Sequence, residues 1–291
     1  MDENSDTIPT LYFGYGSNLD WEDWTKWCQK KGHNPSGLKE IGPAWLDGYY
    51  LCFDYYSRGR EGGAANLRPL ASGRVATPGA LFEINSEALA ALDQKEGHPL
   101  AKYYQREIVT VYTEDGKQHT ALTYIHHAKE DNFFTPTKEY ESLIRNNLER
   151  LDLPTKFLDA ALAENSVEQF EHVFVYGTLM KDQSRHSELK NDSDFICEGR
   201  VRGELYKIRD YPGLINGDDI VQGEVYRAKD MFQLIQRLDW IEQATGDNPL
   251  FKRVILQVDT ELGPVWAYTY HYAESVESCE KIDSGNWKSF N

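Results

Sequence analysis

The stretch Leu11-Tyr12-Phe13-Gly14-Tyr15-Gly16-Ser17-Asn18-Leu19 decides how the rest of the chain is interpreted. A short apolar run, rich in aromatic residues, leads into a Gly-x-Gly sequence and then into small polar residues. This pattern predicts a buried strand that ends in a glycine turn, where unpaired backbone N–H groups can hold an anion. Taken alone, the signal is weak, because glycine serves any tight turn.

A second stretch of the same kind lies near the middle of the chain, at Val173-Phe174-Val175-Tyr176-Gly177-Thr178-Leu179. The segments downstream of the two stretches also repeat, in the order strand, helix, acidic residue and hairpin. Leu92-Asp93-Gln94-Lys95-Glu96 corresponds to Leu238-Asp239-Trp240-Ile241-Glu242, and Tyr104-Gln105-Arg106 corresponds to Phe251-Lys252-Arg253. A repeat of this length predicts duplicated domains rather than a short-period solenoid.

The predicted domain boundary lies at the polar stretch Glu164-Asn165-Ser166. A chain of 291 residues is long for one core and natural for two domains. We expect a first α+β domain over residues 9–169, with helices at its C-terminal end in 137–166. A second α+β domain is expected over 170–275, followed by a polar tail over 276–291.

The composition limits the partners and the compartment. A net charge of −16 argues against nucleic acid and anionic membranes, because phosphate is repelled. The four cysteines are far apart, without metal-ligand or redox spacing. The acidic N-terminus is unlike a signal peptide, and no apolar run is long enough to span a bilayer. We therefore expect a cytoplasmic protein with free thiols and no membrane partner, and the oligomeric state stays open.

Glu96 is the candidate for chemistry beside the first glycine loop. It lies at the end of a predicted helix that stops at Gly97, where the helix dipole disfavours a carboxylate's charge. In a partly buried cleft its pKa would be raised, which suits proton transfer near neutrality. Together with the hydroxyl of Tyr104, an acid and a set of anion-binding donors suit acyl rearrangement. The alternative is that Glu96 lies on solvated surface, as most glutamates do.

Other chemistries find little support in the sequence. No Gly-Lys-Ser/Thr follows the glycine loop, and the third glycine of a dinucleotide fingerprint is missing. His126 and His127 are adjacent, so on a strand they face opposite sides and are poorly placed to share a metal. No serine or cysteine lies in a nucleophile motif. The residues alone indicate a duplicated α+β protein with an anion-binding cleft and one carboxylate.

A resemblance extends this interpretation. Tyr15-Gly16-Ser17-Asn18-Leu19, followed by Glu96-Gly97 and Tyr104, is similar to the γ-glutamylcyclotransferase family. The second half, with Tyr176-Gly177-Thr178-Leu179 and Glu242, resembles the γ-glutamylamine cyclotransferase (AIG2-like) branch. The resemblance implies two tandem domains of the α+β class. Each would be a small mixed β-barrel flanked by helices, with the glycine loop and the glutamate at one end.

The resemblance also implies a reaction. The α-amino group of a γ-glutamyl amine or peptide attacks its own γ-carbonyl, closing 5-oxoproline and expelling the amine. By similarity, Glu96 and Glu242 act as general acid and base, without cofactor or metal. The implied substrate-binding residues are those of the two glycine loops and one tyrosine: Tyr15, Gly16, Ser17, Asn18, Leu19, Tyr104, Tyr176, Gly177, Thr178 and Leu179.

The second half departs from the family pattern. Phe251 stands where a tyrosine is common, and Gln243 replaces the glycine that commonly follows the acid. In the first half, Ser17-Asn18 in place of Ser-Leu argues against glutathione as the substrate. The leaving amine stays open. The alternative is a non-catalytic or half-degenerate γ-glutamyl-ligand binding protein, in which one domain regulates or scaffolds the other.

Overall fold

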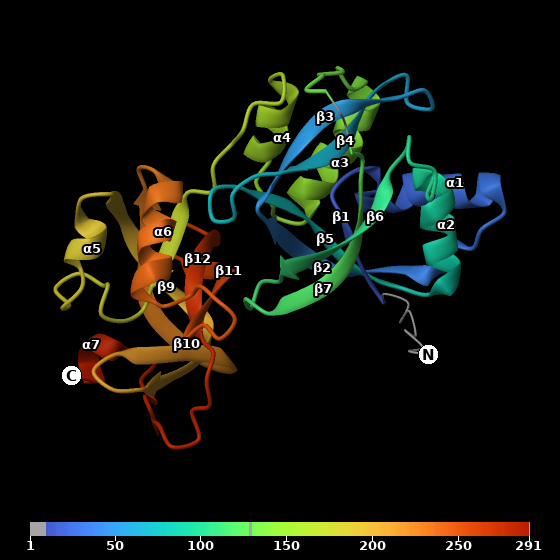
Figure 1. The fold of residues 1–291 in the computed structure, drawn as a ribbon. Coiled ribbons are helices and arrows are strands. Elements are labelled where there is room, and N and C mark those ends of the chain that lie inside the picture. Colours follow the sequence, from blue (N-terminus) through green and yellow to red (C-terminus); the bar gives the residue numbers. More distant parts are fainter. Residues whose placement is uncertain (1–9, 128–129, 291) are drawn as a thin grey trace. The chain divides into compact units, whose positions relative to one another are not determined.

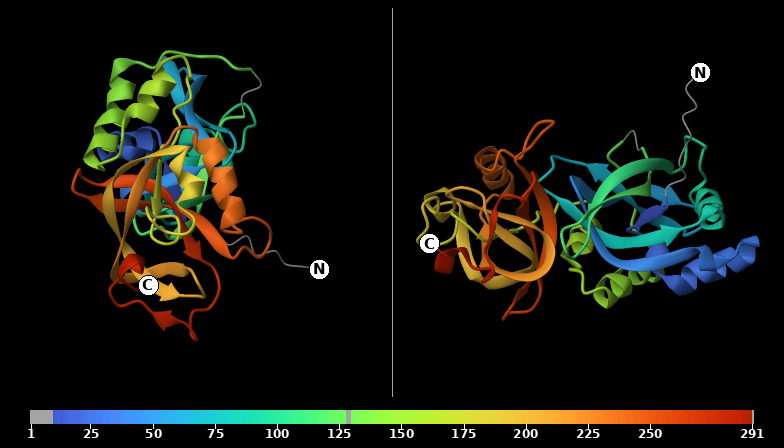
Figure 2. Two further views of the ribbon diagram at one scale, coloured as in Figure 1. Left: turned by 90° about the vertical axis from the view of Figure 1, so that its left-hand side faces the viewer. Right: turned by 90° about the horizontal axis from the view of Figure 1, so that it is seen from below.

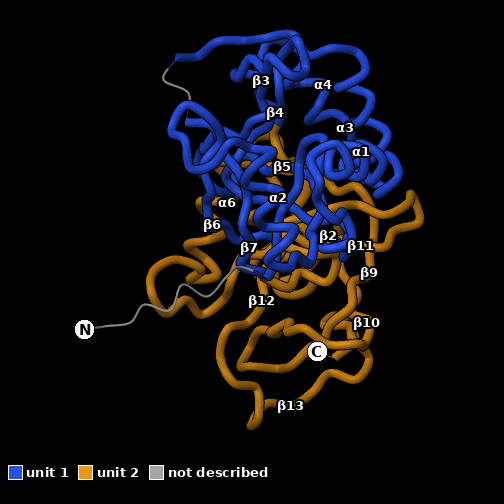
Figure 3. Tube along the Cα trace, turned by 90° about the vertical axis from the view of Figure 1, so that its right-hand side faces the viewer, with its two compact units in different colours: residues 1–111, 119–168 blue, residues 112–118, 169–291 orange. Residues whose placement is uncertain are grey.

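The computed structural model describes residues 10–127 and 130–290. It divides into two compact units, Met1–Val111 with His119–Glu168 and Tyr112–Gln118 with Gln169–Asn291 (Figures 1 and 3). Each unit holds one copy of the glycine loop. Within the described ranges, no helix has both the length and the apolar character needed to cross a membrane.

Unit 1 is built on a closed barrel with the strand order β1-β5-β2-β6-β7. Strand β1 pairs antiparallel with β5 and parallel with β7, so the barrel is mixed. The barrel strands are β1 (Leu11–Gly14), β2 (Leu38–Asp47), β5 (Ala76–Ile84), β6 (Gln105–Tyr112) and β7 (Gln118–Ile125). A separate hairpin consists of β3 (Tyr49–Ser57) and β4 (Gly62–Pro69). The helices are α1 (Trp21–Lys31), α2 (Ser86–Glu96), α3 (Lys138–Arg150) and α4 (Lys156–Leu162).

The ends of α1 and α2 are explained by local sequence. The side chain of Asp20 accepts a hydrogen bond from the backbone N–H of Asp23 and begins α1. Asn85 does the same for α2 through the backbone N–H of Ala88. Helix α2 ends because Gly97 adopts a left-handed conformation with φ of 78°. Glu96 is therefore the last residue of α2, as the sequence predicts.

Unit 2 repeats this arrangement. Its strands are β8 (His172–Val175), β9 (Ser193–Lys207), β10 (Pro212–Ala228), β11 (Phe251–Thr260), β12 (Val265–Tyr272) and β13 (Glu280–Lys281). The order is β10-β8-β12-β11-β9-β13, and a pairing between β10 and β9 closes five of them into a ring. The helices are α5 (Ser187–Lys190), α6 (Met231–Ile241) and α7 (Trp287–Phe290). Figure 2 shows the strands of each unit curving into a ring with helices outside it. The predicted α+β class with two tandem barrels is confirmed.

In each unit, a glycine of a neighbouring strand packs closely against the strand that leads into the site. A Cβ on Gly79 of β5 would stand 2.3 Å from the carbonyl oxygen of Gly14 and 2.8 Å from the ring of Phe13. A Cβ on Gly223 of β10 would stand 2.4 Å from the carbonyl oxygen of Val175 and 2.5 Å from the ring of Phe174. Both glycines are required for close strand packing rather than for a turn.

The polar tail expected over 276–291 differs from the structure. Residues 280–281 form β13 against β9, and residues 287–290 form α7. Ile282 and Trp287 are 3% and 1% exposed. The pairing of β13 with β9 and the burial of these two apolar side chains attach the segment to unit 2, because burying apolar surface stabilises the packed state.

Candidate active sites

The first glycine loop opens onto a cavity of about 360 Å³ in unit 1. After β1, residues Ser17–Leu19 form one turn of 3-10 helix, in which the N–H of Leu19 donates to the carbonyl of Gly16 over 3.1 Å. Six of the predicted site residues line the cavity: Tyr15, Gly16, Ser17, Asn18, Glu96 and Tyr104. Leu19 does not, because its side chain is 2% exposed and packs in the core.

Glu96 is held by the loop itself. The Nδ2 amide of Asn18 donates to Oε1 of Glu96 over 3.0 Å and to the hydroxyl of Tyr12 over 2.8 Å. Burial raises the pKa of the Glu96 carboxyl, while Lys95, the Asn18 hydrogen bond and Arg60 act in the opposite direction. The predicted acid and the predicted loop therefore meet in one cavity.

Two cations line the same cavity, and both contact Asp23. Arg60 donates to the two carboxylate oxygens of Asp23 over 2.9 and 2.6 Å, and the Nζ of Lys95 lies 3.4 Å from Oδ2. These contacts hold the pKa of Asp23 below its usual value against the effect of burial. The first site thus contains a compact charged network beside its acid.

Tyrosines form most of the remaining wall: Tyr12, Tyr15, Tyr55, Tyr103, Tyr104, Tyr124 and Tyr140. Tyr104 donates its hydroxyl proton to the carbonyl of Ala65 over 2.7 Å, and the N–H of Ala65 donates to the hydroxyl of Tyr140 over 3.2 Å. The hydroxyl proton of Tyr104 is thus committed to backbone, and its oxygen remains an acceptor. Tyr104 lies where the sequence predicts, with a hydroxyl fixed in direction.

One hydrogen-bonded anchor is common to both units. In unit 1, Tyr124 donates to Oδ1 of Asp93 over 2.7 Å, and Nε of Arg106 donates to the same oxygen over 2.8 Å. In unit 2, Tyr270 donates to Oδ1 of Asp239 over 2.7 Å, and Arg253 also pairs with Asp239. Each aspartate lies three residues before the site glutamate. The anchor therefore fixes the helix end that carries the acid.

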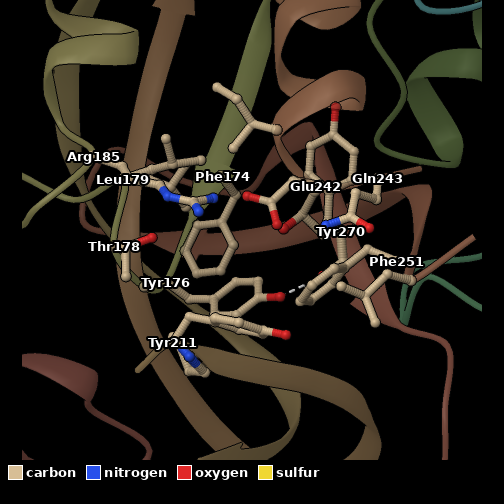
Figure 4. Close-up of a pocket in the computed structure, with 16 residues that line it drawn as sticks. Phe174, Tyr176, Thr178, Leu179, Arg185, Tyr211, Glu242, Gln243, Phe251 and Tyr270 are labelled. Carbon is tan, nitrogen blue, oxygen red and sulfur yellow. Dashed lines mark hydrogen bonds between the residues drawn. The ribbon is translucent and has the colours of Figure 1, made fainter. Parts of the chain in front are cut away.

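The second site is a smaller version of the first, with a cavity of about 70 Å³ (Figure 4). Its lining includes all five predicted residues of this unit: Tyr176, Gly177, Thr178, Leu179 and Glu242. Tyr176 donates to the carbonyl of Tyr270 over 2.6 Å, as Tyr15 does to the carbonyl of Tyr124 over 2.5 Å. Burial raises the pKa of Glu242 to about 7, although Arg185 lowers it. Figure 4 shows the Arg185 side chain beside Glu242.

The two sites differ in the residues around the acid. Leu179 stands in place of Asn18, Ile241 in place of Lys95, and Phe251 in place of Tyr104. Among the described residues, none makes a hydrogen bond to the Glu242 side chain. Glu242 is therefore buried beside Arg185 without a hydrogen-bond partner among the described residues, whereas Glu96 lies in a hydrogen-bonded network.

Sequence reasoning missed the cations of both sites: Lys95, Arg60 and Arg185. The position of Lys95 next to Glu96 was a usable signal, because both lie in the last turn of α2. Arg60 had no such signal. It reaches the cavity from the turn between β3 and β4, and only the fold brings it to Asp23.

The structure offers no metal site in its described ranges, where no group of three or more His, Cys, Asp or Glu is suitably placed. His126 and His127 follow the end of β7 rather than lying on it, and their side chains have different partners. The ring of His126 packs against that of Tyr55, with centroids 4.6 Å apart, and Nε2 of His127 pairs with Glu107 over 2.9 Å.

Both halves of the chain are similar to known proteins. A family model described as "Gamma-glutamyl cyclotransferase, AIG2-like" matches residues 12–142 and again residues 173–289. A protein of Vibrio cholerae serotype O1 named "Putative gamma-glutamylcyclotransferase" is 35% identical over 117 residues, which are 40% of this chain and 93% of that protein. The "Gamma-L-glutamyl-butirosin B gamma-glutamyl cyclotransferase" of Niallia circulans is 28% identical over 127 residues, covering 41% of this chain and 76% of that protein.

Among solved structures, one titled "Gamma-glutamyl cyclotransferase" is 26% identical, with a TM-score of 0.44, and covers 54% of this chain and 87% of that one. The two matches of the family model correspond to the two repeats of the fold. Because one family model matches both halves, the chain belongs to the γ-glutamylcyclotransferase, AIG2-like family.

Proposed function

We propose that this protein cyclises γ-glutamyl amines or peptides to 5-oxoproline and releases the amine. The observation that carries the proposal is the meeting of Glu96 with the loop Gly16-Ser17-Asn18 in one cavity. A carboxyl with a raised pKa, beside donors for an anion, is what this reaction requires. Membership of the family supports the same reaction class.

In the proposed reaction, backbone N–H groups of the loop hold the glutamyl α-carboxylate. Glu96 accepts a proton from the α-ammonium, and the freed nitrogen attacks the γ-carbonyl carbon. A nitrogen–carbon bond forms, and the bond from that carbon to the leaving nitrogen breaks. The α-nitrogen loses two protons and the leaving nitrogen gains two, so a carboxyl that accepts and returns protons is sufficient.

The remaining work is orientation. Nucleophile and carbonyl belong to one molecule, so folding the substrate into a reactive geometry supplies most of the advantage. The tyrosine wall of the first cavity suits this role, because Tyr104 and Tyr140 are themselves fixed through Ala65.

The experiment is a panel of γ-glutamyl amides with detection of 5-oxoproline and free amine. The panel contains γ-glutamyl amino acids, a γ-glutamyl polyamine, ε-(γ-glutamyl)lysine and, because of the Niallia circulans relative's name, γ-L-glutamyl-butirosin B. Stoichiometric release of 5-oxoproline and amine from at least one member is expected. Ligand binding without product across the panel would contradict the proposal.

The second site is included in the proposed function, and its pH dependence gives a prediction. Glu242 must be deprotonated to accept the α-ammonium proton, and burial raises its pKa to about 7. In a chain carrying Glu96→Gln, we expect kcat/KM to rise tenfold per pH unit below about pH 7 and to level off above it. A pH profile measured from 5 to 9 checks this. A profile already level at pH 5.5 would be the contrary result.

One observation favours a binding role for unit 2 instead. Its cavity is small, and Phe251 supplies no hydroxyl where Tyr104 supplies one. If the Glu96→Gln chain makes no 5-oxoproline but binds a γ-glutamyl amide at two sites per chain in calorimetry, unit 2 is a ligand-binding domain.

A further inference from the structure

We propose that Lys95 is a positioning residue of the first site, which orients the amide of Asn18 and thereby determines which oxygen of Glu96 moves protons. The inference rests on the proposed function. It assigns a role to a side chain that touches the acid only through an intermediary, since within the described residues no ion pair links Lys95 to Glu96.

The ammonium group of Lys95 can only donate hydrogen bonds, and it is buried among oxygen atoms that can accept them. Its Nζ lies 2.7 Å from Oδ1 of Asn18, 3.4 Å from Oγ of Ser17 and 3.4 Å from Oδ2 of Asp23. Only 9% of its side chain is exposed. An ammonium group has three donors, and these three oxygens account for all of them.

The charge of Lys95 fixes the direction of the Asn18 amide. Since the ammonium only donates, the amide oxygen must face Lys95, and the NH₂ group must face Glu96 and Tyr12. The reversed amide would place NH₂ against the ammonium and oxygen against the carboxylate. Lys95 therefore converts a side chain with two nearly equivalent orientations into a donor aimed at Glu96.

This orientation distinguishes the two oxygens of Glu96. Oε1 accepts from Nδ2 of Asn18 over 3.0 Å, and the described residues supply no hydrogen bond to Oε2. An oxygen that already accepts an amide hydrogen bond is the poorer site for a proton. Oε2 is thus the oxygen that exchanges protons with the substrate.

Lys95 has a parallel effect on Ser17. Because the Ser17 oxygen accepts from Lys95, its hydroxyl proton must point elsewhere. Ser17 lines the cavity. Its proton is therefore available to an acceptor there, such as the substrate carboxylate.

The charged and titratable groups around Lys95 and Glu96 are compatible with this role of Lys95. Burial lowers the pKa of Lys95, the charges of Asp23 and Glu96 raise it, and Arg60, which pairs with Asp23, lowers it. Besides Lys95, the titratable side chains that interact electrostatically with Glu96 are Tyr12, Tyr15, Tyr55, Tyr104, Tyr124, Tyr140 and Arg60. The tyrosines are neutral near pH 7, so Lys95 and Arg60 are the cations near the acid. Of these two cations, Lys95 is the one that donates to Asn18 in the part of the chain that the structure describes.

Unit 2 provides an internal comparison. There Ile241 and Leu179 occupy the positions of Lys95 and Asn18, so the donor and its relay are absent together. Their joint replacement is the pattern that we expect if Lys95 and Asn18 function together.

The test uses the full chain with Glu242→Gln, so that only the first site acts. Lys95→Met removes the charge but keeps the length, and we expect the acid limb of kcat/KM to move up by about 1 pH unit or more. Lys95→Arg should keep the limb near its original pH. Lys31→Met, which removes an exposed lysine of unit 1 at the end of α1, should leave the profile unchanged.

A double-mutant cycle tests the route through Asn18. Asn18→Leu introduces the residue of unit 2, and adding Lys95→Met to it should cost clearly less than Lys95→Met costs in the parent chain. Additive effects with an unmoved acid limb would overturn the inference. A purely structural role for Lys95 would give that result, lowering the folded fraction without moving the limb.

A readout without turnover separates this inference from the proposed function. The carboxyl ¹³C signal of Glu96, assigned by its loss in Glu96→Gln, reports the pKa of Glu96 directly. If no γ-glutamyl amide yields 5-oxoproline, the proposed function fails, but this titration still decides the role of Lys95 when it is repeated in the Asn18→Leu chain, where Lys95→Met should shift the pKa of Glu96 clearly less than in the parent chain. A Glu96 pKa that is the same in Lys95→Met and the parent chain would contradict it.

Discussion

Replacing Glu96 with Gln in a chain that already carries Glu242→Gln will lower kcat for 5-oxoproline release by at least about 100-fold. Glutamine has the shape of glutamate, and its Oε1 can still accept from Nδ2 of Asn18, as Glu96 does over 3.0 Å. What it lacks is the ability to take a proton from the α-ammonium. The loss should therefore fall on kcat, with KM little changed.

The measurement is initial rates of 5-oxoproline formation for the single and double variants, beside far-UV circular dichroism. The matched control is Glu87→Gln, an exposed glutamate in the first turn of the same helix α2. It makes the same chemical change outside the site, and its turnover should equal that of the unmodified chain. Turnover in the double variant at the level of the unmodified chain would remove Glu96 and Glu242 from the mechanism.

The components of the sites that could be predicted are those with local signals. The strand, the glycine turn and the acid before Gly97 each depend on a few neighbouring residues, and the structure places them at the lining of one cavity. Duplication strengthened the prediction, since Glu242 lies beside the second loop in the same way. The chemistry proposed for these residues stays a prediction until the rates of the Glu96 and Glu242 variants are measured.

The components that escaped prediction come from distant elements. Tyr140 lies in the helical region predicted over 137–166, without a local signal for a role in the site, yet its hydroxyl accepts from the N–H of Ala65 over 3.2 Å and the residue lines the cavity. Arg60 lies in a turn whose destination depends on the β3–β4 hairpin. Periodicity gives the face of a helix, but not which distant loop that face will meet.

Replacing Gly79 with Ala is expected to destabilise unit 1 by at least about 1–3 kcal/mol. The new methyl would lie 2.3 Å from the carbonyl oxygen of Gly14, which is backbone and cannot turn aside. Strand β1 must then move away from β5, with which Gly14 and Phe13 are paired. Because β1 runs directly into the glycine loop, activity of the first site should fall together with the thermal stability of unit 1.

The duplicated fold supplies the controls for this prediction. Gly223→Ala places a methyl 2.4 Å from the carbonyl oxygen of Val175, so it should impair the second site and spare the first. Gly59→Ala has its nearest neighbour at 4.0 Å and should change neither. Calorimetric scans must be fitted with two transitions, since two units need not unfold together. If Gly79→Ala kept the parent stability and rate, β1 would have to be free to shift without moving the loop. The loop would then owe its position to Asn18 and its contacts with Glu96 and Lys95 rather than to the strand before it.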